Sequence, residues 1–419
     1  MTVYLDHAAT TPMIPEAAAA MTAQLTRVGN ASSLHASGRD SRRVVEESRE
    51  QVARALGCRP GEVVFTSGGT ESDNLAVKGL FWARRAQDAR RTRVLSTPIE
   101  HHAVLDPLHW LSTQGARVEL VAVDRVGRID LDALRRTVEA DPGSVALITV
   151  MWANNEVGTV QPIAEVVALA HAHGIPVHTD AIQALGQLPL DFAASGVDAM
   201  TITGHKVGGP YGVGALVVRR ELTPTPLLHG GGQERDVRSG TIDTPAIAGF
   251  AVACELAVAR QPELAARLED LRARMVQGVS RVVPDAVLNG DPESGPEHRL
   301  PGNVHFSFPG CEGDSLLMLL DARGVECSTG SACDAGVPQA SHVLLAMGAP
   351  DGFARSSLRF SLGHTSGPDD VEALVEAIGP VVERARNAAL SSRSGRSRRT
   401  PGHATAGTRP RTGAPRTPA

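Results

Sequence analysis

Short runs rich in valine and isoleucine alternate with longer segments of helical periodicity between about residues 60 and 220. The helical segments, such as "ESDNLAVKGLFWARRAQ" and "LDALRRTVEA", carry apolar residues three and four positions apart. The intervening runs are nearly all apolar, which is typical of parallel strands covered by helices on both faces. The pattern predicts an α/β fold with a mainly parallel, doubly wound sheet. The predicted strands are "EVVFTS", "TRVLSTP", "ARVELVAVD", "SVALITVMW", "IPVHTD", "AMTITG" and "GALVVRR".

The pattern changes after about residue 255, where helical segments lengthen and strands become rarer. Two strands are predicted there, "NVHFSF" and "SLRFSLG", which favours a smaller α+β domain. We predict a large domain over residues 15–255 and a small domain built from residues 1–14 and 256–388. Residues 389–419 are basic, rich in Pro, Gly and Ser, and contain no acidic residue. We predict that this tail is disordered and solvated, with contact to RNA or an acidic partner as the alternative.

Composition and charge narrow the class of protein. Apolar residues make up 42% of the chain but aromatic residues only 3%, so Ala, Val, Leu and Ile must form most of the core. The opening "MTVYLDHAATTP" has no basic or apolar leader, and no run approaches the ~20 apolar residues of a membrane helix. We therefore predict neither a signal peptide nor a membrane span. The net charge of −5 gives no reason to expect nucleic acid as the main ligand.

The cysteines indicate a reducing compartment and no structural metal. There are five, and they lie far apart in the chain. Without an export signal, such a set favours free thiols in the cytoplasm over disulfides. No C-x-x-C pair is present, which argues against structural zinc, and we expect no resident metal. The cysteines are Cys58, Cys254, Cys311, Cys327 and Cys333.

Polar residues follow three of the predicted strands, where ligands bind in an open α/β sheet. The first strand leads into "SGGTESDN", whose small residues let backbone N–H groups approach a phosphate, although such a helix start is more often a simple cap. Asp180 ends "IPVHTD" and is a candidate partner for a protonated ring nitrogen, a metal ligand or a helix cap. Lys206 follows "AMTITG" and suits a Schiff base, because a desolvated lysine becomes nucleophilic. Taken alone, Lys206 would be assigned to the surface.

The three features together match the needs of one cofactor, pyridoxal phosphate. The cradle would anchor its phosphate, Asp180 would keep its ring nitrogen protonated, and Lys206 would hold its aldehyde. The sequence therefore predicts a pyridoxal phosphate site at one edge of the sheet.

At this level of detail the chain resembles the cysteine desulfurases, which are pyridoxal phosphate enzymes of the class V aminotransferase group with the type I fold. The resemblance extends from about residue 3 to residue 388 and rests on motifs that occur in the family's order. It implies a large cofactor-binding domain and a small domain that carries a catalytic cysteine loop. The motifs are "YLDHAATTP", "SGGTESDN", "EHHAVLD", "NNEVGTVQPI", "DAIQALG", "GHKVGGPYGVGAL", "GGGQERDVRSGT", "STGSAC" and "SLRFSLG".

The resemblance implies a role for each matching residue. Lys206 would bind the aldehyde, Asp180 the ring nitrogen and Gln183 the ring oxygen of the cofactor. His101 would stack on the ring and take part in proton transfer. The residues implied in holding the phosphate are Gly69, Thr70, Thr203, His205 and, from the second subunit of an obligate homodimer, Thr241.

The substrate is implied by two further positions. Asn155 and Arg359 would bind the substrate carboxylate, a task that suits a planar and permanently charged guanidinium. Asn155 is also implied in contact with the cofactor.

Cys333 lies in "STGSACDAG", where its Ser, Thr, Gly and Ala neighbours offer little to pack against. A thiolate on such a segment can take sulfur from a substrate as a persulfide and carry it to another protein. The resemblance leaves room for Cys333 to contact an iron–sulfur cluster held by a partner. Cys327 is interpreted as packing, with a resolving or redox role as the alternative. Cys58, Cys254 and Cys311 are interpreted as structural.

The implied activity is conversion of L-cysteine to L-alanine with a persulfide on Cys333. The sulfur would pass to acceptor proteins for iron–sulfur cluster assembly or tRNA thiolation. The alternatives are a selenocysteine lyase or an aminotransferase of the same class, and a non-catalytic scaffold that binds partners or nucleic acid through its basic tail. An aminotransferase would not need Cys333, and a scaffold would not need Lys206, Asp180 and Arg359 together. The segment "DAGVPQASHVL" departs from the family's more usual sequence, which leaves the acceptor open.

Overall fold

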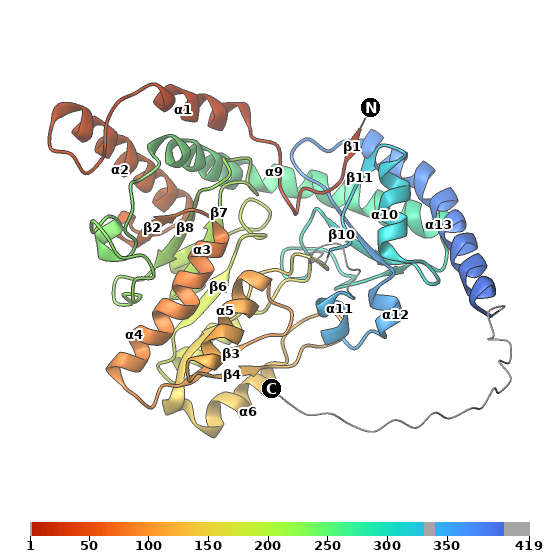
Figure 1. Ribbon diagram of the computed structural model, residues 1–419, viewed down its shortest axis with the longest axis horizontal. Helices are drawn as coiled ribbons and strands as arrows, with labels where there is room; N and C mark the ends of the chain where they lie inside the picture. The colour runs from red at the N-terminus through yellow and green to blue at the C-terminus, as the bar shows by residue number, and fades with distance from the viewer. Residues whose placement is uncertain (1, 331–339, 398–419) are drawn as a thin grey trace, which may run out of the picture.

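The computed structural model describes residues 2–330 and 340–397, and it divides into a large lobe and a small lobe (Figure 1). The large lobe is built on a seven-stranded sheet in the order β2-β8-β7-β6-β5-β3-β4. Only β8 is antiparallel to its neighbours, so the mainly parallel sheet is confirmed, and each predicted run supplies one strand. The strands are β2 (Val63–Thr66), β3 (Arg93–Ser96), β4 (Arg117–Leu120), β5 (Val145–Thr149), β6 (Val177–Asp180), β7 (Ala199–Thr203) and β8 (Gly214–Val218).

Helices cover both faces of this sheet because successive strand residues point to opposite sides. Val63 and Phe65 of β2 join one apolar cluster, which includes residues of α2, α7 and the first part of α9. Val64 joins another, which includes residues of α4 and α5. The helices of the large lobe are α1 (Pro15–Leu25), α2 (Ala36–Leu56), α3 (Gly69–Asn74), α4 (Leu80–Gln87), α5 (His102–Thr113), α6 (Leu131–Ala140), α7 (Ile163–His171) and α8 (Phe192–Ser195), with a π-helical segment η2 (Leu75–Gly79) joining α3 to α4.

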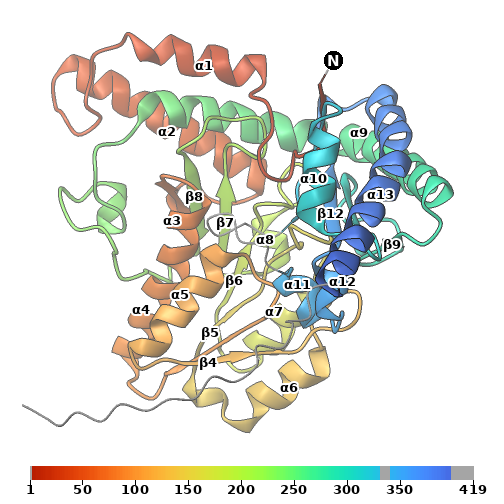
Figure 2. The same ribbon diagram turned by 45° about the vertical axis from the view of Figure 1, so that its right-hand side comes forward.

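The small lobe has its own apolar core, formed by residues such as Leu5, Phe306, Phe360 and Leu374. Its three-stranded antiparallel sheet has the order β12-β10-β9, and β1 pairs with β11 beside it. Figure 2 shows α10 and α13 over this sheet. The elements are β1 (Val3–Tyr4), β9 (Val287–Leu288), β10 (Asn303–Ser307), β11 (Val325–Glu326), β12 (Ser357–Ser361), α10 (Gly313–Asp321), α11 (His342–Ala346), α12 (Asp351–Ala354) and α13 (Pro368–Ser397).

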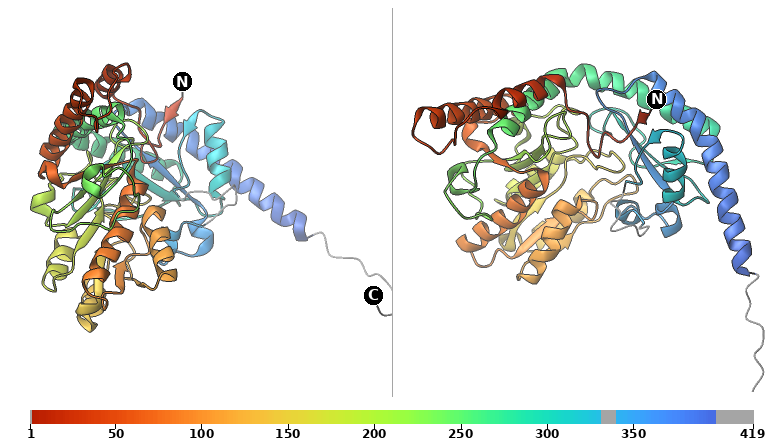
Figure 3. Two further views of the ribbon diagram at one scale, coloured as in Figure 1. Left: turned by 60° about the vertical axis from the view of Figure 1, so that its left-hand side comes forward. Right: turned by 45° about the horizontal axis from the view of Figure 1, so that its top comes forward.

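One long helix, α9 (Thr244–Val282), runs through both lobes. It packs against α1 and α2 in the large lobe and against α13 in the small lobe (Figure 3, right). The boundary predicted at residue 255 therefore lies inside a continuous helix. No helix in the described residues combines the length and the apolar character that crossing a membrane requires.

The structure differs from the predicted tail at its beginning. The backbone of α13 remains helical to Ser397, so the disordered tail that we predicted from residue 389 is wrong for residues 389–397. This segment, "ALSSRSGRS", contains no proline, and its one glycine, Gly395, is tolerated near the end of a helix that is already formed. Residues 398–419 lie outside the described residues.

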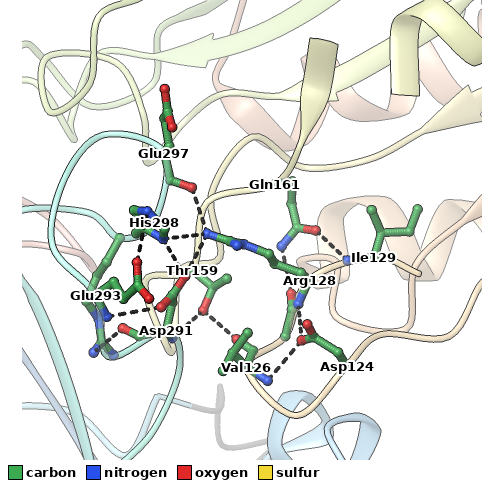
Figure 4. A network of polar contacts seen from close by, with 12 residues as sticks. Asp124, Val126, Arg128, Ile129, Thr159, Gln161, Asp291, Glu293, Glu297 and His298 are labelled. Carbon is green, nitrogen blue, oxygen red and sulfur yellow. Dashed lines mark hydrogen bonds and ion pairs between the residues drawn. The ribbon is translucent and has the colours of Figure 1, made fainter. Parts of the chain in front are cut away.

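A polar network joins loops of the two lobes (Figure 4). Arg128 of the large lobe forms an ion pair of 2.6 Å with Asp291 of the small lobe, and His298 lies 3.0 Å from the same carboxylate. Thr159 donates from Oγ1 to the carbonyl of Val126 and accepts from the N–H of Asp291. Because Thr159 belongs to the motif "NNEVGT", this network fixes a segment that reaches the candidate active site.

Candidate active site

A cavity of about 350 Å³ lies where the carboxyl ends of β5, β6 and β7 meet the small lobe. Side chains that follow the strands line it from the large lobe, and Arg359 of β12 lines it from the small lobe. The predicted site residues that line this cavity are Gly69, Thr70, His101, Asn155, Asp180, Gln183, Thr203, His205, Lys206 and Arg359.

Lys206 lies in the turn that follows β7, and its Nζ donates a 2.6 Å hydrogen bond to the carbonyl of Ala8. Burial and, to a lesser extent, the positive charge of Arg359 together lower the pKa of Lys206 to about 8, against the opposing effect of Asp180. The chain contains only one other lysine, Lys78, whose Nζ lies 4.6 Å from the ring centre of Trp110. Lys206 is therefore the one lysine on this cavity wall, and its amine is a nucleophile at mildly alkaline pH.

Asp180 is the last residue of β6 and is only 5% exposed. Its Oδ1 accepts the N–H of Ile182, and it forms no ion pair among the described residues. Burial raises the pKa of Asp180 to about 6, while that hydrogen bond and the charge of Lys206 act in the opposite direction. A buried carboxylate without a charged partner is suited to a protonated ring nitrogen.

The turn between β2 and α3 has the shape of a phosphate cradle. Gly68 has a φ of 144°, which favours glycine, and a side chain at Gly69 would collide with Ile182. The backbone of this turn can therefore be approached closely. The helix that starts at Gly69 continues through η2 and α4, so its positive end faces the same cavity wall. Thr70, Thr203 and His205 complete this part of the wall.

His101 caps α5, and its Nδ1 accepts the N–H of Ala103 at 3.1 Å. Burial and, to a lesser extent, the nearby charge of Lys206 together lower the pKa of His101 to about 4. The ring is therefore neutral at pH 7. Because Nδ1 accepts a hydrogen bond, the proton is on Nε2, which leaves a neutral donor that can exchange a proton in the cavity.

Arg359 is held from both sides. Its Nη2 pairs with Asp6 at 2.8 Å and its Nη1 donates to the carbonyl of Asn155 at 2.9 Å. Its Nε is buried and has no hydrogen-bond partner among the described residues. Since an unpaired buried N–H is unfavourable, this edge of the guanidinium is suited to an anionic ligand in the cavity.

The N-terminal segment 5–11, here called the strap, passes through the site. The carbonyl of Ala8 accepts both the Lys206 Nζ bond and a 2.9 Å bond from Nε2 of Gln183. Asp6 on the same strap holds Arg359. The strap thereby fixes three side chains that come from separate parts of the sequence.

Sequence reasoning missed three residues around this cavity. Asp6 and Ala8 belong to "YLDHAATTP", a motif that we quoted without assigning roles to its residues. Glu156 is buried on the cavity wall, accepts a 2.5 Å hydrogen bond from Ser341 and lies 3.8 Å from His342. The only signal in the sequence was that these residues belong to the motifs quoted above. Ala8 contributes its backbone carbonyl, and Glu156 is placed by burial, so neither residue type indicates its place in the site.

Two predicted residues are not among those lining the cavity. Thr241 is exposed and lies between η4 (Glu234–Asp236) and α9. Cys333 lies outside the described residues, although Gly330, shortly before it in the sequence, lines the cavity. The described cysteines form no disulfide, and Cys327, Cys254 and Cys311 are buried while Cys58 is half-buried.

The lining fits pyridoxal phosphate. A nucleophilic lysine, a buried carboxylate without a charged partner and a glycine cradle at a helix start share one cavity, as the aldehyde, ring nitrogen and phosphate require. Within the described residues, no group of three or more His, Cys, Asp or Glu side chains is placed to hold a metal ion.

Comparison with known proteins gives the family. Residues 3–374 match the family "Aminotransferase class-V". The chain therefore belongs to the class-V aminotransferase family, and its cofactor is pyridoxal phosphate, as predicted.

Similar proteins narrow the assignment within this family. The chain is 57% identical over 392 residues to an IscS-like cysteine desulfurase of Mycobacterium tuberculosis, with 93% of this chain and 98% of that protein covered. It is 41% identical to a cysteine desulfurase IscS of Dictyoglomus turgidum, with 92% and 95% covered. The solved structure of a NifS-like protein matches with a TM-score of 0.84 and 34% identity, over 92% of this chain and 100% of that one. Within its family the chain is thus a member of the cysteine desulfurases, which confirms the resemblance.

We expect apoenzyme to bind pyridoxal phosphate at a rate that rises with pH to about 8 and then levels off. The pKa of Lys206 is lowered from 10.5 to about 8, so half of the amine is already unprotonated near pH 8. Stopped-flow absorbance of the lysine-bound cofactor measures this profile. Lys78→Arg should keep the wild-type profile, whereas Lys206→Arg should lose the band. A wild-type rate that still climbs about tenfold per pH unit up to pH 10 would contradict the lowered pKa.

Proposed function

We propose that this cysteine desulfurase converts L-cysteine to L-alanine and takes the sulfur as a persulfide on Cys333. The observation that carries the proposal is the arrangement of Lys206, Asp180 and Arg359 in one cavity between the lobes. The amine and the carboxylate would bind the cofactor, and the unpaired edge of the guanidinium would bind the carboxylate of an amino acid. The close relatives named cysteine desulfurases support the choice of substrate.

The substrate carboxylate would bind to Arg359. The guanidinium can offer its unpaired Nε together with the second hydrogen of Nη2, which is a bidentate arrangement for a carboxylate. Asn155 lines the same part of the cavity, and its carbonyl already holds Nη1. Asp6 fixes the guanidinium from the opposite side. The substrate's α-carbon would then face the wall that carries Lys206.

Lys206 and His101 would move protons. Pyridoxal phosphate, held by Lys206, Asp180 and the cradle at Gly69, withdraws electrons from the substrate's α-carbon when it is bound. Lys206 Nζ would take the α-proton, since its lowered pKa leaves part of it unprotonated near neutral pH. His101 would give or take a proton at Nε2, because the ring is neutral and its Nδ1 is occupied.

Cys333 would accept the sulfur. Its thiolate attacks the sulfur of L-cysteine, an S–S bond forms as the Cβ–S bond breaks, and Cβ gains a proton. One thiol and L-cysteine thereby give one persulfide and L-alanine, so no external oxidant or reductant is needed.

We propose that two copies of the chain form a homodimer in which Thr241 completes the partner's phosphate cradle. Thr241 is exposed in the single chain, and its neighbour Ile242 lines a surface groove of about 530 Å³ together with Leu25 and Val28. Leu25 is 59% and Val28 87% exposed, so the groove offers apolar surface that a second copy of the chain would cover.

The sulfur is proposed to pass from Cys333 to proteins of iron–sulfur cluster assembly or of tRNA thiolation, as the resemblance implies. We place this transfer in the cytoplasm. The free state of Cys58, Cys254, Cys311 and Cys327 fits a reducing compartment.

Wild-type enzyme loaded with cofactor should release L-alanine from L-cysteine in the presence of a thiol reductant, and Cys333→Ser should release at least about 10²-fold less because a hydroxyl cannot form a persulfide. Quantifying alanine by mass spectrometry checks this, and the cofactor's absorbance confirms that both proteins are loaded. Equal alanine release by both proteins would exclude Cys333 as the acceptor. Alanine formed only when a keto acid is added would favour an aminotransferase.

Asp6→Asn should raise KM for L-cysteine about tenfold while changing kcat less, because a charge-assisted hydrogen bond that positions Arg359 is lost. Asp351→Asn is the matched control, since Asp351 pairs with Arg355 on the surface at 2.7 Å. Steady-state kinetics with L-cysteine measure both constants. An unchanged or lower KM in Asp6→Asn would mean that Asp6 does not prepare Arg359 for the substrate.

If the chain forms a homodimer, its mass in solution is twice that of one chain. Light scattering at micromolar concentration should give twice the chain mass of 43.9 kDa. Val28→Asp should shift this mass towards the monomer and weaken cofactor retention, because Thr241 would no longer reach a partner's cavity. A wild-type monomer that retains its cofactor fully would refute the shared cradle.

A further inference from the structure

Glu156 lines the active-site cavity, but the proposed reaction gives its side chain no task. The side chain is only 1% exposed, and this burial raises the pKa of its carboxyl group. The backbone of Glu156 is held without the side chain, because Oδ1 of Asn154 accepts the N–H groups of Glu156 and Val157 at 2.9 Å each. The carboxyl group is therefore not needed to shape its own loop, and its contacts lie with other segments.

The first of these contacts is with Ser341, directly before α11. Oγ of Ser341 donates a 2.5 Å hydrogen bond to Oε2 of Glu156 and accepts the N–H of Leu344 at 3.1 Å. One hydroxyl group thus caps α11 and joins it to the large lobe. Ser341 is only 1% exposed, so the loss of this hydrogen bond would leave buried polar atoms unpaired. The next residue, His342, donates from Nε2 to the carbonyl of Glu100 at 3.0 Å.

The second contact is with Gly330. Gly330 has a φ of 85°, and a Cβ atom at this position would lie 3.4 Å from Oε2 of Glu156 and 3.2 Å from Nε2 of His305. The backbone of Gly330 therefore lies directly against the carboxyl group. Ser328, two residues earlier, pairs with the backbone of Arg359 through hydrogen bonds of 3.2 and 2.7 Å. Position 330 is thus fixed between the strand that carries Arg359 and the side chain of Glu156.

Cys333 lies between these two contacts in the sequence. It follows Gly330 by three residues, and an extended chain spans at most ~3.3–3.6 Å per residue, so its Cα atom lies within about 11 Å of that of Gly330. A segment whose two ends are held in place samples fewer conformations than one whose ends move. The contacts of Glu156 therefore restrict the positions that the Cys333 thiol can take relative to the cavity.

We propose that Glu156 is a positioning residue for sulfur transfer. Through Ser341 and Gly330, its carboxyl group holds the two described residues on either side of Cys333 at the wall of the active-site cavity. This inference rests on the proposed role of Cys333 as the sulfur acceptor. Glu156 itself forms and breaks no covalent bond, so the transfer stays balanced between the Cys333 thiol and L-cysteine.

A single-turnover experiment separates substrate binding from sulfur transfer. Enzyme loaded with cofactor is mixed with one equivalent of L-cysteine. The change in the cofactor's absorbance gives the rate of substrate binding, and mass spectrometry of the quenched protein gives the rate at which a persulfide forms on Cys333. A residue that only positions the sulfur acceptor should affect the second rate and not the first.

Ser341→Ala removes the hydroxyl group that binds Glu156 and should slow persulfide formation at least about tenfold, because displacements of about 1 Å can cost about 10²-fold in rate. The absorbance change should keep its wild-type rate, since the hydrogen bond of Lys206 to Ala8 is untouched. Glu156→Ala should give the same result. It leaves the serine cap of α11 in place, so it also shows that the effect does not come from loss of the cap.

Glu156→Gln is the conservative variant. Its side-chain oxygen can still accept the hydrogen bond from Ser341, so most of the wild-type rate of persulfide formation should return. Ser195→Ala is the matched control, because Ser195 donates a 2.9 Å hydrogen bond to the carbonyl of Phe192 in α8 and is not among the residues that line the active-site cavity. Both rates should be unchanged in this control.

Three results would overturn the proposal. The first is persulfide formation at the wild-type rate in both Ser341→Ala and Glu156→Ala. The second is an equal slowing of the absorbance change and of persulfide formation, because Glu156 would then act on substrate binding. The third is a Glu156→Gln variant as slow as Glu156→Ala, because the hydrogen bond to Ser341 would then not be what matters. Absence of a persulfide on Cys333 of loaded wild type would instead refute the proposed function, and with it the task assigned to Glu156.

Discussion

The burial of an amine and a carboxyl group in one cavity is the constraint on which the rest of the structure depends. Lys206 and Asp180 both leave water on folding, and desolvation alone would drive each towards its neutral form. Each group's charge partly offsets that effect on the other. The result is a lysine with a pKa of about 8 and an aspartate with a pKa of about 6, so that both groups titrate within reach of neutral pH. The parallel sheet makes this possible because β6 and β7 end side by side.

The small lobe and the strap supply the parts of the active site that the large sheet does not. Arg359 comes from β12, yet its guanidinium is held by Asp6 of the strap and by the carbonyl of Asn155 in the large lobe. The side chain of Arg299, which is almost fully buried, donates to the carbonyl of Val157 at 2.7 Å. Two arginines of the small lobe therefore fix the segment that carries Asn155 and Glu156. The substrate site that we propose at Arg359 therefore depends on contact between the lobes.

The sequence predicted the strands well and selected strand-end side chains that line one cavity, for a physical reason. Strands buried on both faces must be continuously apolar, so a polar residue directly after one, such as Asp180, stands out. Lys206 was recognisable only together with Asp180 and the glycine cradle, because a lysine taken alone would be assigned to the surface. The contact of Asp6 with Arg359 could not be predicted, because the two residues lie far apart in the chain and meet only in the folded structure. The prediction missed the helical backbone of residues 389–397 because it used only the composition of the tail. A helix that has already formed before residue 389 can continue into a segment that would not start one.

Reductive trapping tests most directly whether Lys206 binds the cofactor. Borohydride reduction of the holoenzyme makes the link between lysine and cofactor permanent, and peptide mapping then locates it. With only two lysines in the chain, the answer is unambiguous. We predict a single modified peptide that contains Lys206, and an unmodified Lys78. Modification of Lys78, or of neither lysine in a fully loaded enzyme, would contradict this prediction.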